Sequence, residues 1–130
     1  MAAAPPFAGY GVNTPRLDPV LLGKHEHDGT WTLLLQIPPD LAYFSGHFPQ
    51  APVLPGVVQV AWALGFAAQR FGTPVRCRVM EALKFQRLLR PGDRVDLTLR
   101  YDAARHKVHF AYRLDDIACS SGRLAWSVES

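Results

Sequence analysis

Residues 57–71 read VVQVAWALGFAAQRF, and this stretch decides the fold. Nearly every position before Gln69 is apolar, and Gly72 follows, as is typical of the C-terminal end of a helix. The pattern predicts one helix from about Val57 to Phe71. A helix that is apolar on every side is expected to be buried on every side. In a chain of 130 residues this requires a sheet wrapped around the helix.

Strand-like segments flank this helix on both sides. Val20–His27 and Thr30–Ile37 precede it and are joined at Asp28-Gly29, a strong hairpin signal. Four further runs with strand character follow it: about Val75–Leu89, Arg94–Asp102, Lys107–Leu114 and Ile117–Val128. The sequence therefore predicts the α+β class, with a curved antiparallel sheet around one long central helix. The last four strands are expected to form a meander.

The length of 130 residues suits a single domain. Residues 1–14 (MAAAPPFAGYGVNT) are rich in Ala, Pro and Gly and predict a flexible N-terminal arm, which leaves residues 15–130 as the domain. A sheet of this kind leaves an edge strand, so dimerisation through the sheet is expected.

Composition excludes several classes of function. The formal net charge of +3 is a mild basic excess without dense Lys/Arg clusters, which argues against nucleic acid and suits an acidic partner. Cys77 and Cys119 match no metal or redox spacing, and His25-Glu26-His27 lacks further nearby ligands, so no metal site is expected. There is no signal-peptide pattern, and the apolar stretch Val57–Gln69 is too short to span a bilayer. A cytoplasmic protein is expected.

The segment before the helix carries a recognisable motif. Residues 47–57, from His47 to Val57, read HFPQAPVLPGV and resemble the HFPxxPxxPGV signature of hotdog-fold 3-hydroxyacyl-[acyl-carrier-protein] dehydratases. Residues 83–85 (LKF) and 89–93 (LRPGD) are similar to the KF…PGD segment of that family, in the right order. Residues 54–59 (LPGVVQ), followed by Trp62, look like the branch found in aryl-polyene pathways. The resemblance implies the hotdog fold and dehydration of a 3-hydroxyacyl thioester to the trans-2-enoyl product.

Such a dehydration needs a base, an acid and a dipole that stabilises charge on the thioester carbonyl. His47 suits the base, because an unperturbed histidine has a pKa of about 6.5. Gly56 lies at the predicted helix start, where backbone N–H groups lack helical partners and meet the positive end of the dipole. Its missing side chain would let a thioester oxygen approach closely. The resemblance gives Gly56 the same role.

The expected acid is missing. The resemblance implies a Glu or Asp fourteen residues after His47, and this chain has Ala61 there. Gln59 is about 200° round the helix from Ala61 and is expected to face elsewhere. Glu81 and Asp40 lie outside the helix, and Glu81 is expected to be a structural charge on a strand.

Three interpretations of Ala61 stay open. His47 could work alone, with a water or with a remote carboxylate. Ala61 could be an engineered inactivating substitution. The chain could instead be a degenerate subunit that pairs with a complete partner, since sites in the resembled family are composite between two chains.

The resemblance also suggests how substrate and partners bind. An acyl chain would need an apolar tunnel, for which the candidates, each of which could be ordinary core, are Phe48, Pro55, Val57, Trp62, Leu64, Phe66 and Phe85. Lys84, Arg87 and Arg90 could form a basic rim for an acidic acyl carrier protein, or a solvated face. No cofactor of its own is expected, because the substrate is carried on the phosphopantetheine of the carrier.

The expected assembly is a homodimer, or a heterodimer with another hotdog protein. Two alternatives to the dehydratase also follow from the resemblance. The chain could be a hotdog acyl thioesterase, or a non-catalytic acyl-binding subunit of such a heterodimer.

Overall fold

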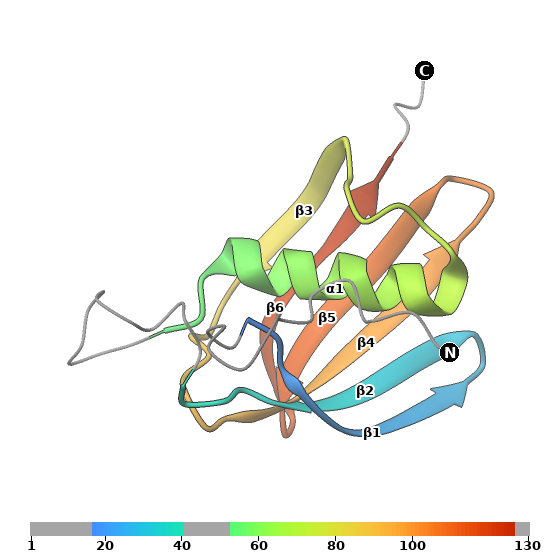
Figure 1. The fold of residues 1–130 in the computed structure, drawn as a ribbon. Coiled ribbons are helices and arrows are strands. Elements are labelled where there is room, and N and C mark those ends of the chain that lie inside the picture. The colour runs from blue at the N-terminus through green and yellow to red at the C-terminus, as the bar shows by residue number, and fades with distance from the viewer. Residues whose placement is uncertain (1–16, 41–52, 127–130) are drawn as a thin grey trace.

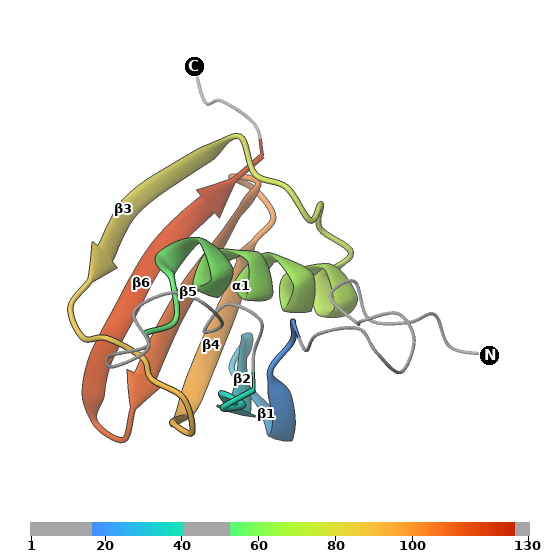
Figure 2. The same cartoon turned by 60° about the vertical axis from the view of Figure 1, so that its left-hand side comes forward.

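The computed structural model describes residues 17–40 and 53–126, which form one curved antiparallel sheet around one helix (Figures 1 and 2). The elements in chain order are β1 (Val20–His27), β2 (Thr30–Gln36), α1 (Gly56–Phe71), β3 (Val79–Phe85), β4 (Arg94–Asp102), β5 (Lys107–Leu114) and β6 (Ile117–Ala125). The predicted α+β architecture is confirmed. The predicted arm, residues 1–14, lies outside the described residues, and so do His47 and Phe48. Of the family motif at residues 47–57, only residues 53–57 are described.

The β1–β2 hairpin forms as the Asp28-Gly29 signal predicts. Asp28 has φ 50° and Gly29 has φ 77°, so both central residues adopt the left-handed conformation that a tight two-residue hairpin needs. His27 pairs with Thr30 across this turn. The turn therefore fixes the register of the two strands.

The prediction of a four-strand meander is wrong. The strand order is β1-β2-β4-β5-β6-β3, so β3 lies at an edge beside β6 and β4 pairs with β2 (Figure 1). The connection from β3 to β4, residues 86–93, is no tight hairpin. It crosses the end of the sheet, where Leu89 O accepts from Leu54 N at 2.8 Å and Asp93 O accepts from Ile37 N at 2.8 Å. These bonds hold the segment against β2 and the start of α1.

Strand ends also differ from the predicted ones. The third predicted strand shortens to Val79–Phe85. Gln86 N and Arg87 N still donate to Cys119 O of β6, but from Leu89 onward the segment bonds to Leu54 and Ile37 instead. The last strand ends at Ala125, and its predicted continuation to Val128 runs partly outside the described residues.

The core lies between α1 and the concave face of the sheet. Trp62, Ala63 and Ala67 on the helix are at most 1% exposed, and they meet a layer of fully buried side chains from the sheet: Leu33, Leu35, Leu97, Leu99, Val108 and Leu124. Each large apolar side chain buried in this way contributes roughly 1.5–3 kcal/mol to folding. No described helix is long and apolar enough to cross a membrane.

The expectation that α1 is buried on every side is wrong for this chain by itself. Val57 is 78% exposed, and Ala61, one turn later, is also exposed. The reason is geometric, since the sheet curves around only part of the helix circumference (Figure 2). At its C-terminal end the helix stops as predicted, where Gly72 adopts φ 73° and donates its amide to Ala68 O.

Candidate functional site

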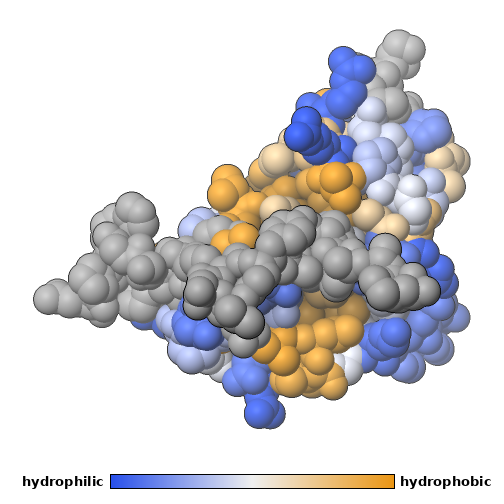
Figure 3. Space-filling model, viewed as in Figure 1, coloured by the Kyte–Doolittle hydropathy of each residue, from blue (hydrophilic) through white to orange (hydrophobic). Residues whose placement is uncertain are grey.

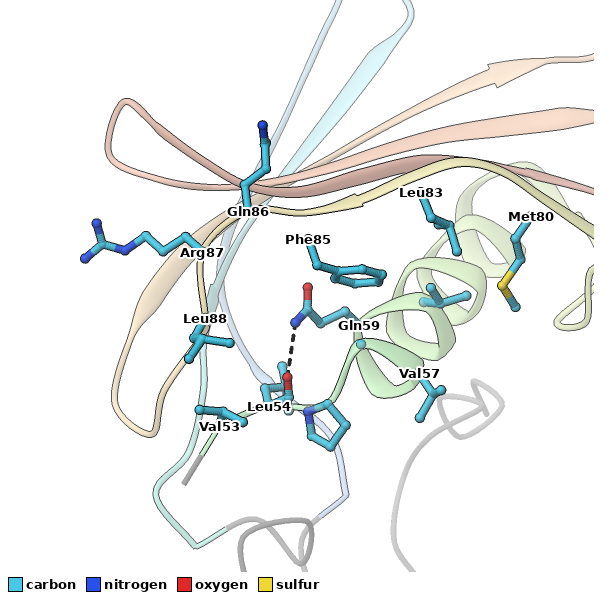
Figure 4. Close-up of a pocket in the computed structure, with 13 residues that line it drawn as sticks. Val53, Leu54, Val57, Gln59, Met80, Leu83, Phe85, Gln86, Arg87 and Leu88 are labelled. Carbon is cyan, nitrogen blue, oxygen red and sulfur yellow. Dashed lines mark hydrogen bonds between the residues drawn. The ribbon is translucent and has the colours of Figure 1, made fainter. Parts of the chain in front are cut away.

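A cavity of about 530 Å³ opens at the start of α1 (Figure 4). One wall comes from the chain that enters the helix and from its first turns, residues 53–60, and the other from β3 and its continuation, residues 80–88. Most of these residues are apolar, and Arg87 is the charged one among them. Pockets of this volume and character suit small apolar ligands.

The first residues of α1 line this cavity and include amides without a described hydrogen-bond partner. Pro55 is the N-cap and offers no side-chain hydrogen bond, and the first turn holds no acidic residue. Val58 N and Gln59 N both donate to Pro55 O, at 3.1 and 3.2 Å. The amides of Gly56 and Val57 donate to no residue that the structure describes. Two N–H groups at the positive end of the helix dipole are therefore available to an acceptor.

Gly56 is in close contact with the ring of Phe85 on β3. A Cβ atom on Gly56 would lie 2.8 Å from both Cε1 and Cζ of Phe85, closer than van der Waals contact allows. The sequence suggested that a glycine is needed here for the approach of a substrate oxygen. The structure adds a second reason, because an aromatic ring already packs against its Cα.

Gln59 is the polar exception in the buried face of α1. Its side chain is 3% exposed and donates from Nε2 to Leu54 O at 3.2 Å (Figure 4). The prediction that Gln59 faces away from Ala61 is confirmed, since Gln59 is buried while Ala61 is exposed. The sequence reasoning did not assign Gln59 a structural role, although a glutamine within an apolar helix is a signal for a buried hydrogen bond.

The predicted substrate-binding residues divide between the cavity and the core. Pro55, Val57 and Phe85 line the cavity, as does Gly56. Trp62 is 1% exposed and donates from its indole N–H to Leu17 O at 3.1 Å. It lies in the core with two other predicted residues, Leu64 and Phe66, and does not line the cavity.

The proposed basic rim is also divided. Arg87 lines the cavity, whereas Lys84 lines a separate hollow together with His109 and Arg123. Arg90 lines neither, and its backbone amide donates to Asp93 Oδ2 at 2.8 Å in the turn before β4. Only one of the three predicted cations therefore stands beside the site.

The described part of the cavity wall contains no Asp, Glu, His or Tyr side chain, so it offers no obvious proton-transfer group. Glu81 on β3 does not line the cavity and forms two ion pairs, in which its Oε1 lies 2.9 Å from Lys107 Nζ and 3.2 Å from Arg123 Nε. Hydrogen bonds from Lys107 and then from Arg123 hold the pKa of this carboxyl below its ordinary value of 4.5. Glu81 is thus a structural charge, as predicted. Asp40 is exposed and does not line the cavity.

Within residues 17–40 and 53–126, no group of three or more His, Cys, Asp and Glu side chains could hold a metal ion. The imidazoles of His25 and His27 stack with ring centroids 6.2 Å apart, and His27 Nε2 lies 3.0 Å from Asp28 Oδ2. These groups belong to the exposed end of the β1–β2 hairpin.

The fold and a family match define the class of protein. The fold is the hotdog fold that the sequence predicted, shared with solved dehydratase structures. Residues 23–123 match the family model of ApeI-like proteins, described as ApeI dehydratase. The chain belongs to this ApeI-like dehydratase family, which confirms the predicted resemblance and its aryl-polyene branch.

Individual relatives agree with this assignment. A solved structure of the dehydratase heterocomplex ApeI:P from Xenorhabdus doucetiae aligns with a TM-score of 0.76 at 30% identity, covering 83% of this chain and 96% of that one. A FabZ 3-hydroxyacyl-[acyl-carrier-protein] dehydratase from Sorangium cellulosum is 29% identical over 66% of this chain and 63% of its own length. A second FabZ, from Nitratidesulfovibrio vulgaris, is 33% identical over 64% of this chain and 58% of its own length. The chain therefore spans about three fifths of these curated relatives.

Proposed function

We propose that the protein is a dehydratase acting on 3-hydroxyacyl thioesters carried by an acyl carrier protein, with the trans-2-enoyl thioester as product. The observation that carries the proposal is the cavity at the start of α1, where apolar walls stand beside the open amides of Gly56 and Val57. Apolar walls suit an acyl chain, and open amides suit a carbonyl oxygen on which charge develops. The curated relatives carry this activity in their names.

In the proposed reaction, the Gly56 amide donates to the thioester carbonyl and stabilises negative charge as the adjacent carbon loses its proton. One such donor is worth roughly 10²–10³ in kcat. His47, which lies outside the described residues, takes the proton from this carbon. The electron pair then forms the double bond as the 3-hydroxyl leaves, and the hydroxyl takes up a proton to depart as water.

The proton for the leaving hydroxyl is proposed to come from a second subunit. The described cavity wall has no proton donor, and Ala61 stands where the family motif implies a carboxyl. Several large apolar side chains around the cavity remain exposed in the single chain: Val57, Met80, Leu83, Phe85 and Leu88. We call these residues the apolar rim. Figure 3 shows hydrophobic surface gathered over β3 and the start of α1.

The proposed partner is another hotdog subunit, seated on the apolar rim beside the edge strand β3. Among the described strands, β3 pairs only with β6, so its other edge is open to a partner strand. The similar Xenorhabdus structure is itself a heterocomplex. A carrier protein would approach the cavity past Arg87, and its phosphopantetheine would bring the substrate, so that no further cofactor is proposed.

The experiment is a turnover assay on a 3-hydroxyacyl carrier-protein substrate, with enoyl formation followed by mass spectrometry. The chain is assayed alone and with a second hotdog subunit. We expect enoyl product, and a loss of at least about 100-fold in His47→Ala, which is the size of a general-base contribution. Unchanged turnover in His47→Ala would refute the mechanism, and release of free thiol without enoyl product would indicate a thioesterase.

A matched pair at Ala61 tests the missing acid. In the chain assayed without a different hotdog subunit, Ala61→Glu is expected to raise turnover, because Ala61 does not line the cavity of its own chain and a carboxyl there would serve the cavity of a second copy. Ala61→Gln is the control, since the amide has a similar size and is no general acid. Equal effects of the two substitutions would show that a carboxyl at this position is not what the single chain lacks.

A further inference from the structure

A buried polar network joins the start of α1 to the sheet. Ser120 Oγ on β6 donates to Gln59 Oε1 at 2.6 Å, and Gln59 Nε2 donates to Leu54 O at 3.2 Å. Tyr112 on β5 donates its hydroxyl to the backbone carbonyl of Gln59 at 2.7 Å. All three network side chains are at most 3% exposed. Gln59, Ser120 and Tyr112 are called the Gln59 network below.

The Gln59 network fixes the chain that enters the helix. Leu54 stands two residues before Gly56, and its carbonyl accepts from Gln59 while its amide donates to Leu89 O at 2.8 Å. Pro55 follows with φ −60° and ψ 147°, so the path into the first turn has little freedom. The orientation of the Gly56 amide is therefore set through Leu54 by hydrogen bonds that end on β6 and β5.

Helix docking alone does not account for such a network. The neighbouring buried positions of α1, Val58, Val60 and Trp62, pack against the sheet mainly through apolar contact. A polar group in such a place is costly unless every partner is present, whereas a leucine of similar volume would pack without that demand. The network lies at the end of α1 that opens on the cavity, and the other end packs through aromatic rings such as Trp31 and Phe71, with centroids 6.5 Å apart.

We propose that Gln59 is a positioning residue for the dehydration, supported by Ser120 and Tyr112, and that it acts through Leu54 on the open amides of Gly56 and Val57. The proposal rests on the function proposed above. Donors to a developing oxyanion must be held within about 0.5 Å of their productive place, and misplacement by about 1 Å can cost roughly 100-fold in rate. Although Gln59 lines the cavity, its side-chain amide is bound by Leu54 O and Ser120 Oγ, so the Gln59 network supplies that constraint through the fold.

The first test is Gln59→Leu, which keeps the volume and removes both side-chain hydrogen bonds. We expect kcat to fall at least about ten-fold with little change in KM, because amides displaced from the carbonyl lose transition-state stabilisation. Val108→Ala is the control for general destabilisation, since Val108 is fully buried on β5 and does not line the cavity. It should lower the urea midpoint and leave kcat unchanged.

A milder pair of substitutions removes a tyrosine hydroxyl and keeps the aromatic ring, so that the hydrogen bond is tested apart from ring packing. Tyr112→Phe removes only the hydroxyl that donates to Gln59 O, and Tyr101→Phe removes a hydroxyl for which the described residues show no hydrogen bond. Tyr112→Phe should lower kcat several-fold, and Tyr101→Phe should not. Equal effects would contradict the proposal.

Gln59→Glu gives a readout that a purely structural role would not produce. A neutral carboxyl can accept from Ser120 and donate to Leu54 O, whereas a carboxylate cannot donate and faces the carbonyl dipole. Burial raises the pKa of the Tyr112 phenol well above its ordinary value of 10.0, so this donor stays neutral throughout. The ratio of variant to wild-type kcat should therefore rise as pH falls. A ratio that is flat with pH would overturn the proposal.

A measurement that needs no turnover tests the positioning role of Gln59 independently of the proposed function. The amide NMR signals of Gly56 and Val57 are compared between wild type and Gln59→Leu, with Val108→Ala as control. We expect shifts of these two signals in Gln59→Leu alone. If the wild type dehydrates no thioester, the proposed function fails while this measurement still tests positioning. Unmoved Gly56 and Val57 signals together with wild-type kcat in Gln59→Leu would refute the positioning role of Gln59.

Discussion

The contact between Gly56 and Phe85 joins the first residue of α1 to the last residue of β3, which are separated in the sequence by the rest of the helix and of the strand. The ring of Phe85 lies where a side chain on residue 56 would begin, 2.8 Å from an added Cβ. Phe85 is itself 51% exposed, so its ring can swing outward more easily than the backbone can shift. A side chain at residue 56 would therefore have to displace this ring, so the neighbour disfavours any residue larger than glycine there.

Gly56→Ala is expected to lower the free energy of unfolding by about 1 kcal/mol, at the lower end of the usual cost of overpacking. In a Phe85→Ala background the same substitution should cost much less, because the contact is gone. Urea unfolding of the four proteins in this double-mutant cycle measures the coupling. Gly23→Ala is the control, since an added Cβ there meets nothing within 4 Å. Additive effects at residues 56 and 85 would contradict the steric account.

For single residues, the sequence predicted the features that depend on neighbouring positions and missed the contacts between segments far apart in the chain. Gly56 at the helix start and the direction of Gln59 follow from helical geometry, which depends only on nearby positions. The partners of Gln59 do not, because Ser120 is 61 residues away and Tyr112 donates to its carbonyl from 53 residues away. Only the pairing of β5 and β6 brings these side chains beneath the helix.

Among the elements, β3 is the one whose place the sequence could not give. Alternating apolar residues predict that a segment is a strand, and they do not say which strand lies beside it. Residues 86–93 are long enough to cross the end of the sheet, and their bonds to Ile37 and Leu54 carry the chain away from a hairpin. The strand thus becomes the open edge beside the cavity.

Glu81 links this edge strand to Arg123 on the adjacent strand β6 and to Lys107 on β5, the next strand in the sheet. Because these partners hold the pKa of the Glu81 carboxyl below 4.5, the folded state favours the ionised form. The resulting stability is present above the ordinary pKa and is lost as pH falls through the lowered value. The contribution is expected to be modest, because the carboxylate is partly exposed to solvent.

Glu81→Gln is therefore expected to lower the urea midpoint at neutral pH and to lower it less at a second, acidic pH below 4.5, because the wild-type carboxyl loses its ionised form as pH falls through its lowered pKa. Asp116→Asn makes the same charge change in the exposed turn between β5 and β6 and serves as control. A Glu81→Gln effect of the same size at both pH values would show that the charge is not what fastens β3.

For the whole molecule, the proposed reaction and the exposed surface lead to the same partner. The described cavity wall lacks a proton donor, while the apolar rim leaves side chains such as Met80 and Leu88 more than half exposed. A second hotdog subunit on this face would cover the rim and could bring a carboxyl to the cavity. The sequence predicted dimerisation through an edge strand, and we infer from the exposed rim that β3 is the edge involved.

Met80→Glu is expected to abolish this association, because it places a charge within an apolar interface at the open edge of β3. Leu22→Glu is the matched control, since Leu22 is 42% exposed on β1, the strand at the opposite edge of the sheet. Sedimentation analysis of each protein, alone and with a second hotdog subunit, measures the mass of the assembly. Wild type and Leu22→Glu should sediment as two subunits and Met80→Glu as one. Loss of association in Leu22→Glu instead would place the interface at β1, and the proposed completion of the cavity by a partner on the apolar rim would then be wrong.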